Sequence, residues 1–380
     1  MYKTPQGFSF STTSLGLKQN KSDDFVLITT DKPAACAAVF TQNTCLGAPV
    51  VVSKEHLNTT NTVKAILINA GIANVATGEK GIEDAKNCAQ MVAKNLRCKT
   101  EEVLVSSTGI IGHFLVINNM IQAIPLLVEN QNKNIEHVAK AIMTTDTVHK
   151  IAEAQCGNAS IVGVTKGAGM IAPNMATTLT FIMTDANIPK EKLQIKWKEI
   201  IDKTFNMMSI DNCESTSDMA IVLANGYEEV DENEFFEKLY NVAESLTKQL
   251  VRDGEGATTL IECNVNNCDN QKNAQILAKS VINSDLVKTA IHGKDPNWGR
   301  IVQALGGTYI PIDFSKITIS LDKQIVFSQG RPNEDFDISQ IFQNEECIID
   351  IDCHSGNFSA KAWGCDLSKE YITINADYHT

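Results

Sequence analysis

The chain has 380 residues, of which 43% are hydrophobic and 21% charged, so it is long enough for about two or three domains with a buried core. It carries 33 basic and 45 acidic residues, which give a formal net charge of −12. This charge argues against a protein that coats nucleic acid or an anionic membrane, and we expect neither as a partner.

Apolar runs alternate with amphipathic segments through the first two thirds of the chain. Residues 79–96 show the helical pattern most clearly, because their apolar positions recur with the period of an α-helix. The pattern predicts helices over residues 79–96, 115–131 (interrupted at Pro125), 193–208 and 232–251. It predicts strands, rich in β-branched residues, over residues 24–30, 63–69, 103–107, 161–165 and 177–184.

The last third of the chain is richer in strands. A long helix is predicted over residues 273–291. Strands are predicted over residues 259–265, 316–321, 324–328, 347–353, 358–363 and 371–375. We therefore expect an α/β (α+β) sandwich in which helices cover mixed β-sheets, with a strand-rich C-terminal subdomain from about residue 275.

The cysteines and the N-terminus bear on the compartment. Eleven cysteines cannot all pair, and no C-x-x-C motif occurs, so we expect free thiols in a reducing cytoplasm and no metal site. The N-terminal residues show no charged region followed by an apolar one, as a signal peptide would. No run approaches the about 18 apolar residues of a membrane span, so we expect a soluble protein.

Residues 160–185 form the most unusual stretch, and three interpretations compete for it. The first is a dinucleotide site, because residues 167–172 fit the spacing G-x-G-x-x-A after a strand. That fingerprint needs a helix directly afterwards, whose N-terminus holds the pyrophosphate. Here Pro173 and a further strand follow, which argues against this interpretation.

The second interpretation is a glycine-rich turn between two core strands with no chemistry, as most Gly-x-Gly turns are. It leaves the polar residues Lys166, Asn174 and Thr177 beside an apolar loop without an explanation.

In the third interpretation, Thr177 becomes an N-terminal nucleophile after the chain cleaves itself. A threonine hydroxyl needs a base beside it, and a terminal α-amino group supplies one with a pKa of about 8. The Thr177 hydroxyl would attack the Ala176 carbonyl, shift the acyl group from nitrogen to oxygen, and leave a new amino terminus after ester hydrolysis. The glycines and Pro173 before this bond, and the strand after it, suit that chemistry.

The stretch K-G-A-G-M-I-A-P-N-M-A-T-T-L, residues 166–179, resembles the signature of the ornithine acetyltransferase (ArgJ) family, which is cut between Ala and Thr. The resemblance runs nearly end to end. Its other motifs include S-S-T-G-I-I-G (106–112), M-T-T-D-T (143–147), R-D-G-E-G-A-T (252–258), K-D-P-N-W-G-R-I (294–301) and N-A-D-Y-H-T (375–380). Motifs of this length in one order favour the third interpretation.

The resemblance implies roles for individual residues. Thr177 is the expected nucleophile, which carries the acetyl group as an ester, and Thr108 and Gly109 match the oxyanion-hole pair, where one lost donor typically costs ~10²–10³ in rate. Lys166 would pair with a substrate carboxylate and Glu255 with a substrate ammonium. The matched substrate-binding positions are Thr145, Lys166, Thr177, Glu255, Asn375 and Thr380.

The resemblance also implies a fold, a reaction and an assembly. The fold would be ArgJ/DmpA-like, related to N-terminal-nucleophile folds. Cleavage would give an α chain, residues 1–176, and a β chain, residues 177–380, assembled as α2β2. The enzyme would move an acetyl group from N2-acetylornithine to glutamate in arginine biosynthesis without a cofactor, and some family members also use acetyl-CoA. The alternatives are a self-processing amidohydrolase or aminopeptidase, and a nucleotide-binding protein without catalysis.

Three positions depart from the family pattern. Ile72 stands where the family usually has Asn, Thr178 stands where Met is common, and residues 211–218 read D-N-C-E-S-T-S-D instead of D-G-D-T-S-T-N-D. None of these changes removes a catalytic group. The acids in the last segment lack the glycine and glutamate spacing of a calcium loop, so we expect no metal there.

Overall fold

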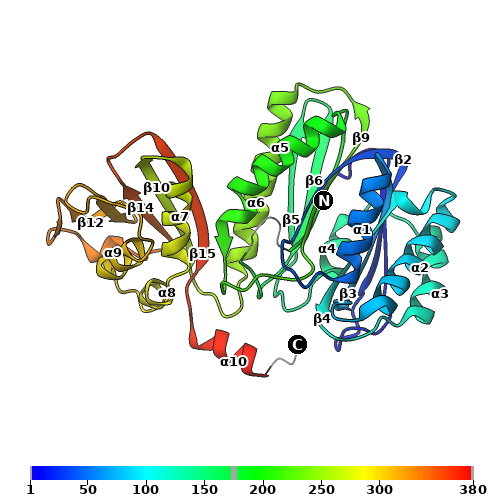
Figure 1. The fold of residues 1–380 in the computed structure, drawn as a ribbon, viewed down its shortest axis with the longest axis horizontal. Helices are drawn as coiled ribbons and strands as arrows, with labels where there is room; N and C mark the ends of the chain where they lie inside the picture. The colour runs from blue at the N-terminus through cyan, green and yellow to red at the C-terminus, as the bar shows by residue number, and fades with distance from the viewer. Residues whose placement is uncertain (1, 173–177, 378–380) are drawn as a thin grey trace.

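Two mixed β-sheets and the helices that pack on them make up the computed structural model (Figure 1). The structure describes residues 2–172 and 178–377, so Ala176, Thr177 and Thr380 lie outside the described residues. The predicted fold class, mixed sheets covered by helices, is confirmed.

The first sheet is the larger one, with the order β4-β3-β2-β9-β7-β6-β5 and β1 paired with β2. The β3–β4 and β7–β9 pairs are parallel, and the other pairs are antiparallel. Every residue of β7 is buried, as in a strand with both faces covered. The strands are β1 (Phe8–Thr13), β2 (Phe25–Phe40), β3 (Thr62–Ile72), β4 (Val103–Ile110), β5 (Lys150–Cys156), β6 (Ala159–Lys166), β7 (Leu179–Ala186) and β9 (Met219–Glu228).

Helices cover both faces of this sheet. Helices α5 and α6 pack against β2, β5 and β6, and α2 and α3 enclose a separate cluster against β3 and β4 (Figure 1). Helix α4 packs on a third cluster, formed by the alternate residues of the same strands on the opposite face. Helix α6 packs on the sheet along its whole length because its buried residues recur at the helical period. The helices of this part are α1 (Ala48–Thr59), α2 (Gly78–Leu96), α3 (Ile117–Glu129), α4 (Ile135–Ala141), α5 (Lys190–Lys203) and α6 (Glu232–Arg252).

The second sheet has the order β13-β12-β11-β14-β10-β15-β8. One continuous core joins it to the first sheet, since Leu246 of α6, Ile261 of β10 and Leu277 of α7 belong to the same buried cluster. The elements are β8 (Met208–Ser209), β10 (Leu260–Cys268), α7 (Gln271–Ile282), α8 (Asp285–His292), α9 (Trp298–Gly306), β11 (Thr318–Leu321), β12 (Gln324–Ser328), β13 (Arg331–Pro332), β14 (Glu346–Asp352) and β15 (Phe358–Cys365).

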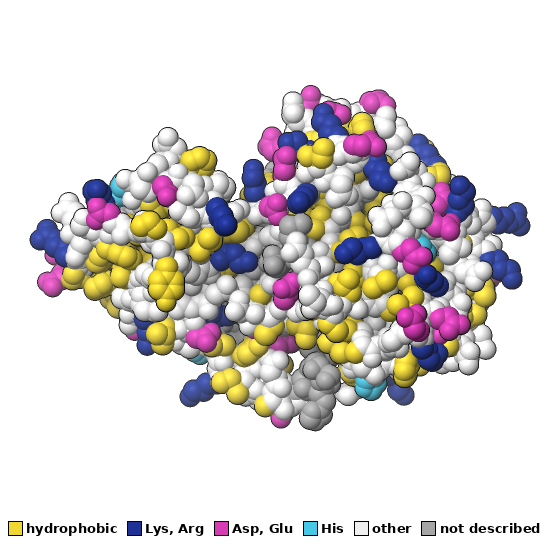
Figure 2. Space-filling view, viewed as in Figure 1, with side chains coloured by type: hydrophobic (Ala, Val, Ile, Leu, Met, Phe, Trp, Pro, Cys, Tyr) yellow, Lys and Arg dark blue, Asp and Glu magenta, His cyan; other side chains and the backbone are white. Residues whose placement is uncertain are grey.

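The two sheets form two lobes with a hollow between them on the face shown in Figure 2, where basic and acidic side chains are interspersed. Helix α10 (Lys369–Asp377) leaves the end of β15 and runs below the lobes in the view of Figure 1. None of its described residues is buried. It is therefore attached to the molecule by surface contacts alone.

Several predicted elements are wrong. Residues 371–375, predicted as a strand, belong to helix α10, and the single helix over 273–291 is two helices, because the Ser284 hydroxyl accepts a hydrogen bond from the Val287 N–H and starts α8. Helix 193–208 ends at Lys203, and α3 runs through Pro125 without interruption. Strand β4 continues to Ile110, beyond the predicted end. The pattern gave no prediction for β1, α1, α4, β5, β9 and α9.

The expected start of the C-terminal subdomain also shifts. Residue 275 falls inside α7, and β10 already pairs with β14 and β15 of the second sheet. The strand-rich part therefore begins before residue 275.

Candidate active site

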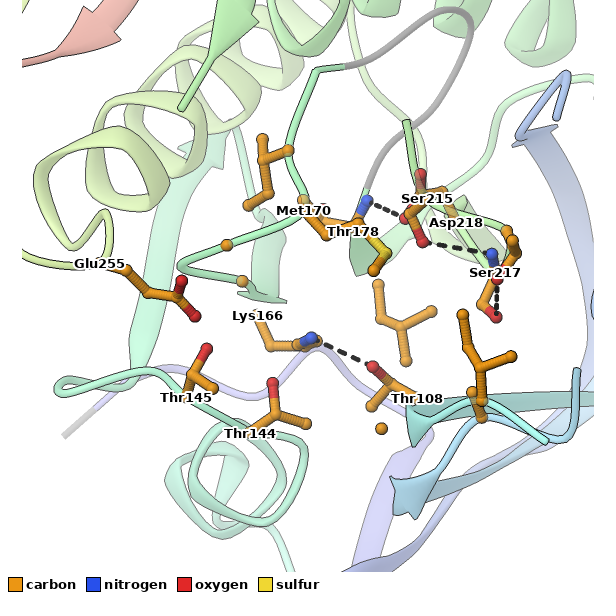
Figure 3. Close-up of a pocket in the computed structure, with 18 of the residues that line it drawn as sticks. Thr108, Thr144, Thr145, Lys166, Met170, Thr178, Ser215, Ser217, Asp218 and Glu255 are labelled. Carbon is orange, nitrogen blue, oxygen red and sulfur yellow. Dashed lines mark hydrogen bonds between the residues drawn. The ribbon is translucent and has the colours of Figure 1, made fainter. Parts of the chain in front are cut away.

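A cavity of about 150 Å³ lies where β4 and β6 end and where β7 begins (Figure 3). The segment before β9, the loop after α6 and helix α10 close its other sides. Because β6 and β7 are antiparallel neighbours, the end of one and the start of the other meet at the same edge of the sheet. Segments far apart in the sequence thus meet at one place.

Thr108 and Gly109 form the β4 wall of the cavity. Gly109 lies opposite Gly71 of β3, and both have a positive φ, 126° and 122°. A Cβ on Gly109 would lie 2.2 Å from the Gly71 carbonyl carbon, so the close approach of the two strand ends requires glycine. The neighbouring Thr108 hydroxyl accepts a hydrogen bond from Lys166 Nζ at 3.1 Å.

Lys166 extends into the cavity from the end of β6 (Figure 3). Burial lowers the pKa of its ammonium group, while the carboxylates of Asp146, Asp218 and Glu255 raise it. The ammonium is thus surrounded by acids and still directed toward the cavity, where an anionic substrate group would find it.

A buried ion network supports Lys166 from behind. Lys150, completely buried at the start of β5, places its Nζ 2.6 Å from Asp146 Oδ1 and 2.5 Å from Asp253 Oδ2. Asp146 Oδ1 also accepts the Gly167 N–H at 2.6 Å. Burial raises the pKa of Asp146, but the charges of Lys150 and Lys166 outweigh it and lower that pKa. The network fixes the segment that carries Thr145 to the end of β6.

Residues 167–171 form a loop that a second carboxylate holds. Asp211 accepts the N–H groups of Met170 and Ile171 at 2.6 Å and 2.9 Å. No helix occurs over residues 167–172, so the helix that a dinucleotide fingerprint needs is absent from that segment. Asp211 therefore holds this loop in place through its hydrogen bonds. The described residues contain no group of three potential metal ligands.

Glu255 packs directly on this loop. Its backbone N–H donates to the Ala168 carbonyl at 2.8 Å, and a Cβ on Gly169 would lie 2.4 Å from its Oε2. A residue larger than glycine at position 169 would therefore collide with the Glu255 carboxylate where it reaches the cavity. Asn375 of α10 donates from Nδ2 to the same Oε2 at 2.8 Å, which attaches the helix to the site.

Thr178 borders the cavity at the start of β7. Its φ of 91° is strained for a β-branched residue. Its N–H donates to Asp218 Oδ1 at 2.7 Å, and its hydroxyl lies 3.1 Å from that of Thr165 and 2.9 Å from that of Thr180. Burial raises the pKa of the Asp218 carboxyl to about 7, although hydrogen bonds from the Thr178 N–H and the Ser215 hydroxyl act to lower it.

The structure brings six of the predicted site residues together at this cavity: Thr108, Gly109, Thr145, Lys166, Glu255 and Asn375. Ala176, Thr177 and Thr380 lie outside the described residues. No role was predicted from the sequence for Lys150 or for the supporting carboxylates Asp146, Asp211, Asp218 and Asp253. Asp146 stands inside a family motif and Asp253 inside another, which is the signal that could have indicated them.

The comparisons with known proteins show the family of the chain. The model of the ArgJ family matches residues 9–380. A Clostridium acetobutylicum protein named arginine biosynthesis bifunctional protein ArgJ 2 is 41% identical over 383 residues, which cover 99% of this chain and 98% of that protein. The chain belongs to the ArgJ family. The predicted resemblance is confirmed.

Two solved members of similar description match parts of the chain. An arginine biosynthesis bifunctional protein ArgJ from Bacillus halodurans is 38% identical with a TM-score of 0.51, covering 53% of this chain and 100% of that one. An ornithine acetyltransferase from Mycobacterium tuberculosis, solved in complex with ornithine, is 30% identical with a TM-score of 0.40, covering 45% of this chain and 94% of that one. In residues 2–172 and 178–377, we find no helix long and apolar enough to span a bilayer.

Proposed function

We propose that this ArgJ-family enzyme transfers the acetyl group of N2-acetylornithine to glutamate through an acetyl ester on Thr177. One observation carries the proposal: residues from distant segments that match the family's site line a single cavity beside Thr178, the residue that directly follows Thr177. Acetyl-CoA is proposed as a second donor, in keeping with the word bifunctional in the relatives' names.

The charges around the cavity suit amino-acid substrates. Lys166 offers an ammonium group to a carboxylate, and Glu255 offers a carboxylate to an ammonium group. Ornithine and glutamate both carry these two groups. One pocket can therefore serve both halves of a ping-pong reaction, first the release of ornithine and then the attack of glutamate on the ester.

The β4 wall suits the developing negative charge. Thr108 and Gly109 lie on the same cavity as Thr178, and a hydroxyl or backbone N–H there would stabilise the oxyanion of a tetrahedral intermediate. Lys166, which donates to the Thr108 hydroxyl, would orient that group. Water, not a cofactor, would complete the self-cleavage, and no cofactor enters the acetyl transfer.

Self-cleavage between Ala176 and Thr177 would supply the nucleophile's own base. The Bacillus halodurans chain supports this step: all of it is matched by 53% of this chain, so it has about the length of one cleavage product. The products, residues 1–176 and 177–380, would stay together because β9 and β7 of the second product lie between β2 and β6 of the first in one sheet. An α2β2 assembly and a cytoplasmic location belong to the same proposal.

Intact-mass analysis with an acceptor assay tests this function. The wild-type chain should give two fragments that separate before Thr177, and T177A should stay whole. With labelled acetylornithine, the label should pass to glutamate. Transfer of the acetyl group to water alone would instead favour an amidohydrolase, and a wild-type chain that never cleaves would remove the mechanism.

A further inference from the structure

The carboxylate of Asp366 is buried directly after β15, where several donors meet it. Its side chain is 0% exposed. Its Oδ1 accepts the N–H groups of Thr258 and Thr259 at 2.7 Å and 2.8 Å. Its Oδ2 accepts a hydrogen bond from the Thr258 hydroxyl at 2.6 Å and lies 2.7 Å from Nδ1 of His292. Each oxygen therefore has partners, as a buried carboxylate requires.

These hydrogen bonds fix one end of the loop that carries Glu255. The loop joins α6 to β10, and Thr259 directly precedes β10. Asp366 also donates its own N–H to the Thr259 carbonyl at 3.1 Å. Ser368 holds the middle of the loop, because its hydroxyl donates to the Gly256 carbonyl at 2.6 Å. The loop is thus bound to the segment after β15 at successive positions.

The packing of the loop on this segment is close on both sides of Glu255. A Cβ on Gly254 would lie 2.9 Å from Cys365 Sγ, and a Cβ on Gly256 would lie 2.5 Å from the backbone nitrogen of Tyr371. Both contacts are closer than a side chain tolerates, so the two neighbours of Glu255 are glycines. The Glu255 carboxylate between them extends into the cavity (Figure 3).

The same segment determines where α10 begins. Ser368 directly precedes this helix, and its Oγ accepts the Tyr371 N–H at 3.4 Å. Further along the helix, Asn375 donates to Oε2 of Glu255 at 2.8 Å. Asp366 and Ser368 therefore connect the loop of Glu255 with the helix of Asn375, the two places from which these side chains reach one cavity.

We propose that Asp366 and Ser368 are positioning residues of the acetyl transfer, a role that rests on the proposed function. They hold the Glu255 carboxylate where it meets the ammonium group of the substrate. In N2-acetylornithine the α-nitrogen carries the acetyl group, so the only ammonium group is that of the side chain. Neither Asp366 nor Ser368 is among the described residues that line the cavity, so both act through Glu255.

Two acetyl donors that differ in this ammonium group test the proposal. N2-acetylnorvaline has the carbon chain of N2-acetylornithine and lacks its side-chain nitrogen. In a ping-pong reaction, kcat/KM for the donor reports the first half-reaction alone, so we compare the ratio of kcat/KM for the two donors. The wild type should prefer N2-acetylornithine. D366A should lose ~10-fold of this preference and S368A about three-fold.

Two further variants calibrate the ratio. E255A removes the carboxylate itself and should abolish the preference. D366N keeps an oxygen that can accept the N–H groups of Thr258 and Thr259, so it should recover part of the preference that D366A loses. A loss of folded enzyme lowers the rates with both donors equally and leaves their ratio unchanged.

The matched control is D322A. Asp322 also accepts two backbone N–H groups, those of Phe342 and Ile348 at 2.9 Å and 2.8 Å, but it lies in the turn between β11 and β12 of the second sheet. D322A should keep the wild-type preference whatever stability it loses. The same loss of preference in D322A and D366A would overturn the specific role of Asp366.

The outcomes separate the two proposals. If D366A and S368A keep the wild-type preference while E255A loses it, the positioning role is overturned and the proposed function is intact. A wild-type enzyme that transfers no acetyl group from N2-acetylornithine overturns the proposed function, and this role with it. If circular dichroism shows D366A to be unfolded, S368A decides: an unchanged ratio in S368A overturns the role.

Discussion

The two sides of the cavity are held by different forces. On the strand side, Thr108, Gly109 and Lys166 stand at the ends of paired strands above a buried ion network. On the other side, α10 buries no residue and contributes Asn375 through one hydrogen bond to Glu255, while its Tyr371 hydroxyl lies 3.4 Å from Asp211. The difference indicates that the strand side is held rigidly and that α10 is attached by few contacts. In the proposed function, the strand side would fix the reacting groups and α10 would add substrate contacts.

The largest expected effect comes from K150A, which removes the cation of the buried network. Two carboxylates, Asp146 and Asp253, would then be buried without their partner, so we expect a loss of about 3–5 kcal/mol in the free energy of unfolding. Urea unfolding measures it. The control is K86A, whose ion pair with Glu55 is exposed and should change stability little. Equal effects of the two variants would contradict a structural role for the network.

The substitution G109A should have the second largest effect on the free energy of unfolding. The new Cβ would meet Gly71 at 2.2 Å and the φ of 126° would be strained, so we expect a loss of roughly 2–4 kcal/mol and of most acetyl transfer. G112A is the matched control, because Gly112 also has a positive φ, 83°, but open space where the Cβ would stand. If both variants lose the same stability, the close approach of the strands is not the cause.

The stability of the strand side should also depend on pH through Asp218. Its carboxyl has a folded-state pKa raised from 3.8 to about 7, so the folded state binds the proton more tightly than the unfolded state. The stability that this proton adds to the folded state is fully present below about pH 4 and is lost as the pH rises to about 7. D218N removes it, and its stability relative to the wild type should therefore increase through that window by on the order of 1 kcal/mol per pH unit. A difference that is constant with pH would contradict the raised pKa.

The smallest effect on stability is expected on the α10 side, from N375A. The substitution removes one hydrogen bond to the Glu255 carboxylate from an exposed helix, so thermal unfolding should be unchanged. If Asn375 also contacts the substrate, KM should rise roughly ten-fold with little change in kcat. I372A, at an exposed position of the same helix, should alter neither. A large loss of stability in N375A would show that α10 is structural.

The contrast between elements packed on the sheets and α10 also explains how much of the fold could be predicted from the sequence. Helices α2 and α6 begin and end close to their predicted bounds, because their apolar faces pack on the sheets that the pattern anticipates. Residues 371–375 alternate like a strand, yet none of the described strands pairs with them and they form α10. The break between α7 and α8 was missed because apolar positions continue across it, although Ser284 is a typical helix cap.

The site was predictable only in part. Sequence motifs indicated Lys166, Glu255 and Asn375, but composition and spacing alone would have left each as an ordinary surface residue. Lys150 and Asp253 are separated by 103 positions and meet only after folding, so no local pattern could pair them. For Asp218, the sequence predicted only that its segment binds no metal, because the burial of Asp218 beside Thr178 depends on the register of β9 and β7.

The most direct measurement is to locate the acetyl group on the enzyme. The purified protein is incubated with acetylornithine in the absence of glutamate, quenched with acid and analysed by peptide mass spectrometry. We predict one acetyl group on the side chain of Thr177, at the start of the new chain, and its loss when glutamate is added. An enzyme that makes N-acetylglutamate while its Thr177 peptide stays unmodified would contradict the account.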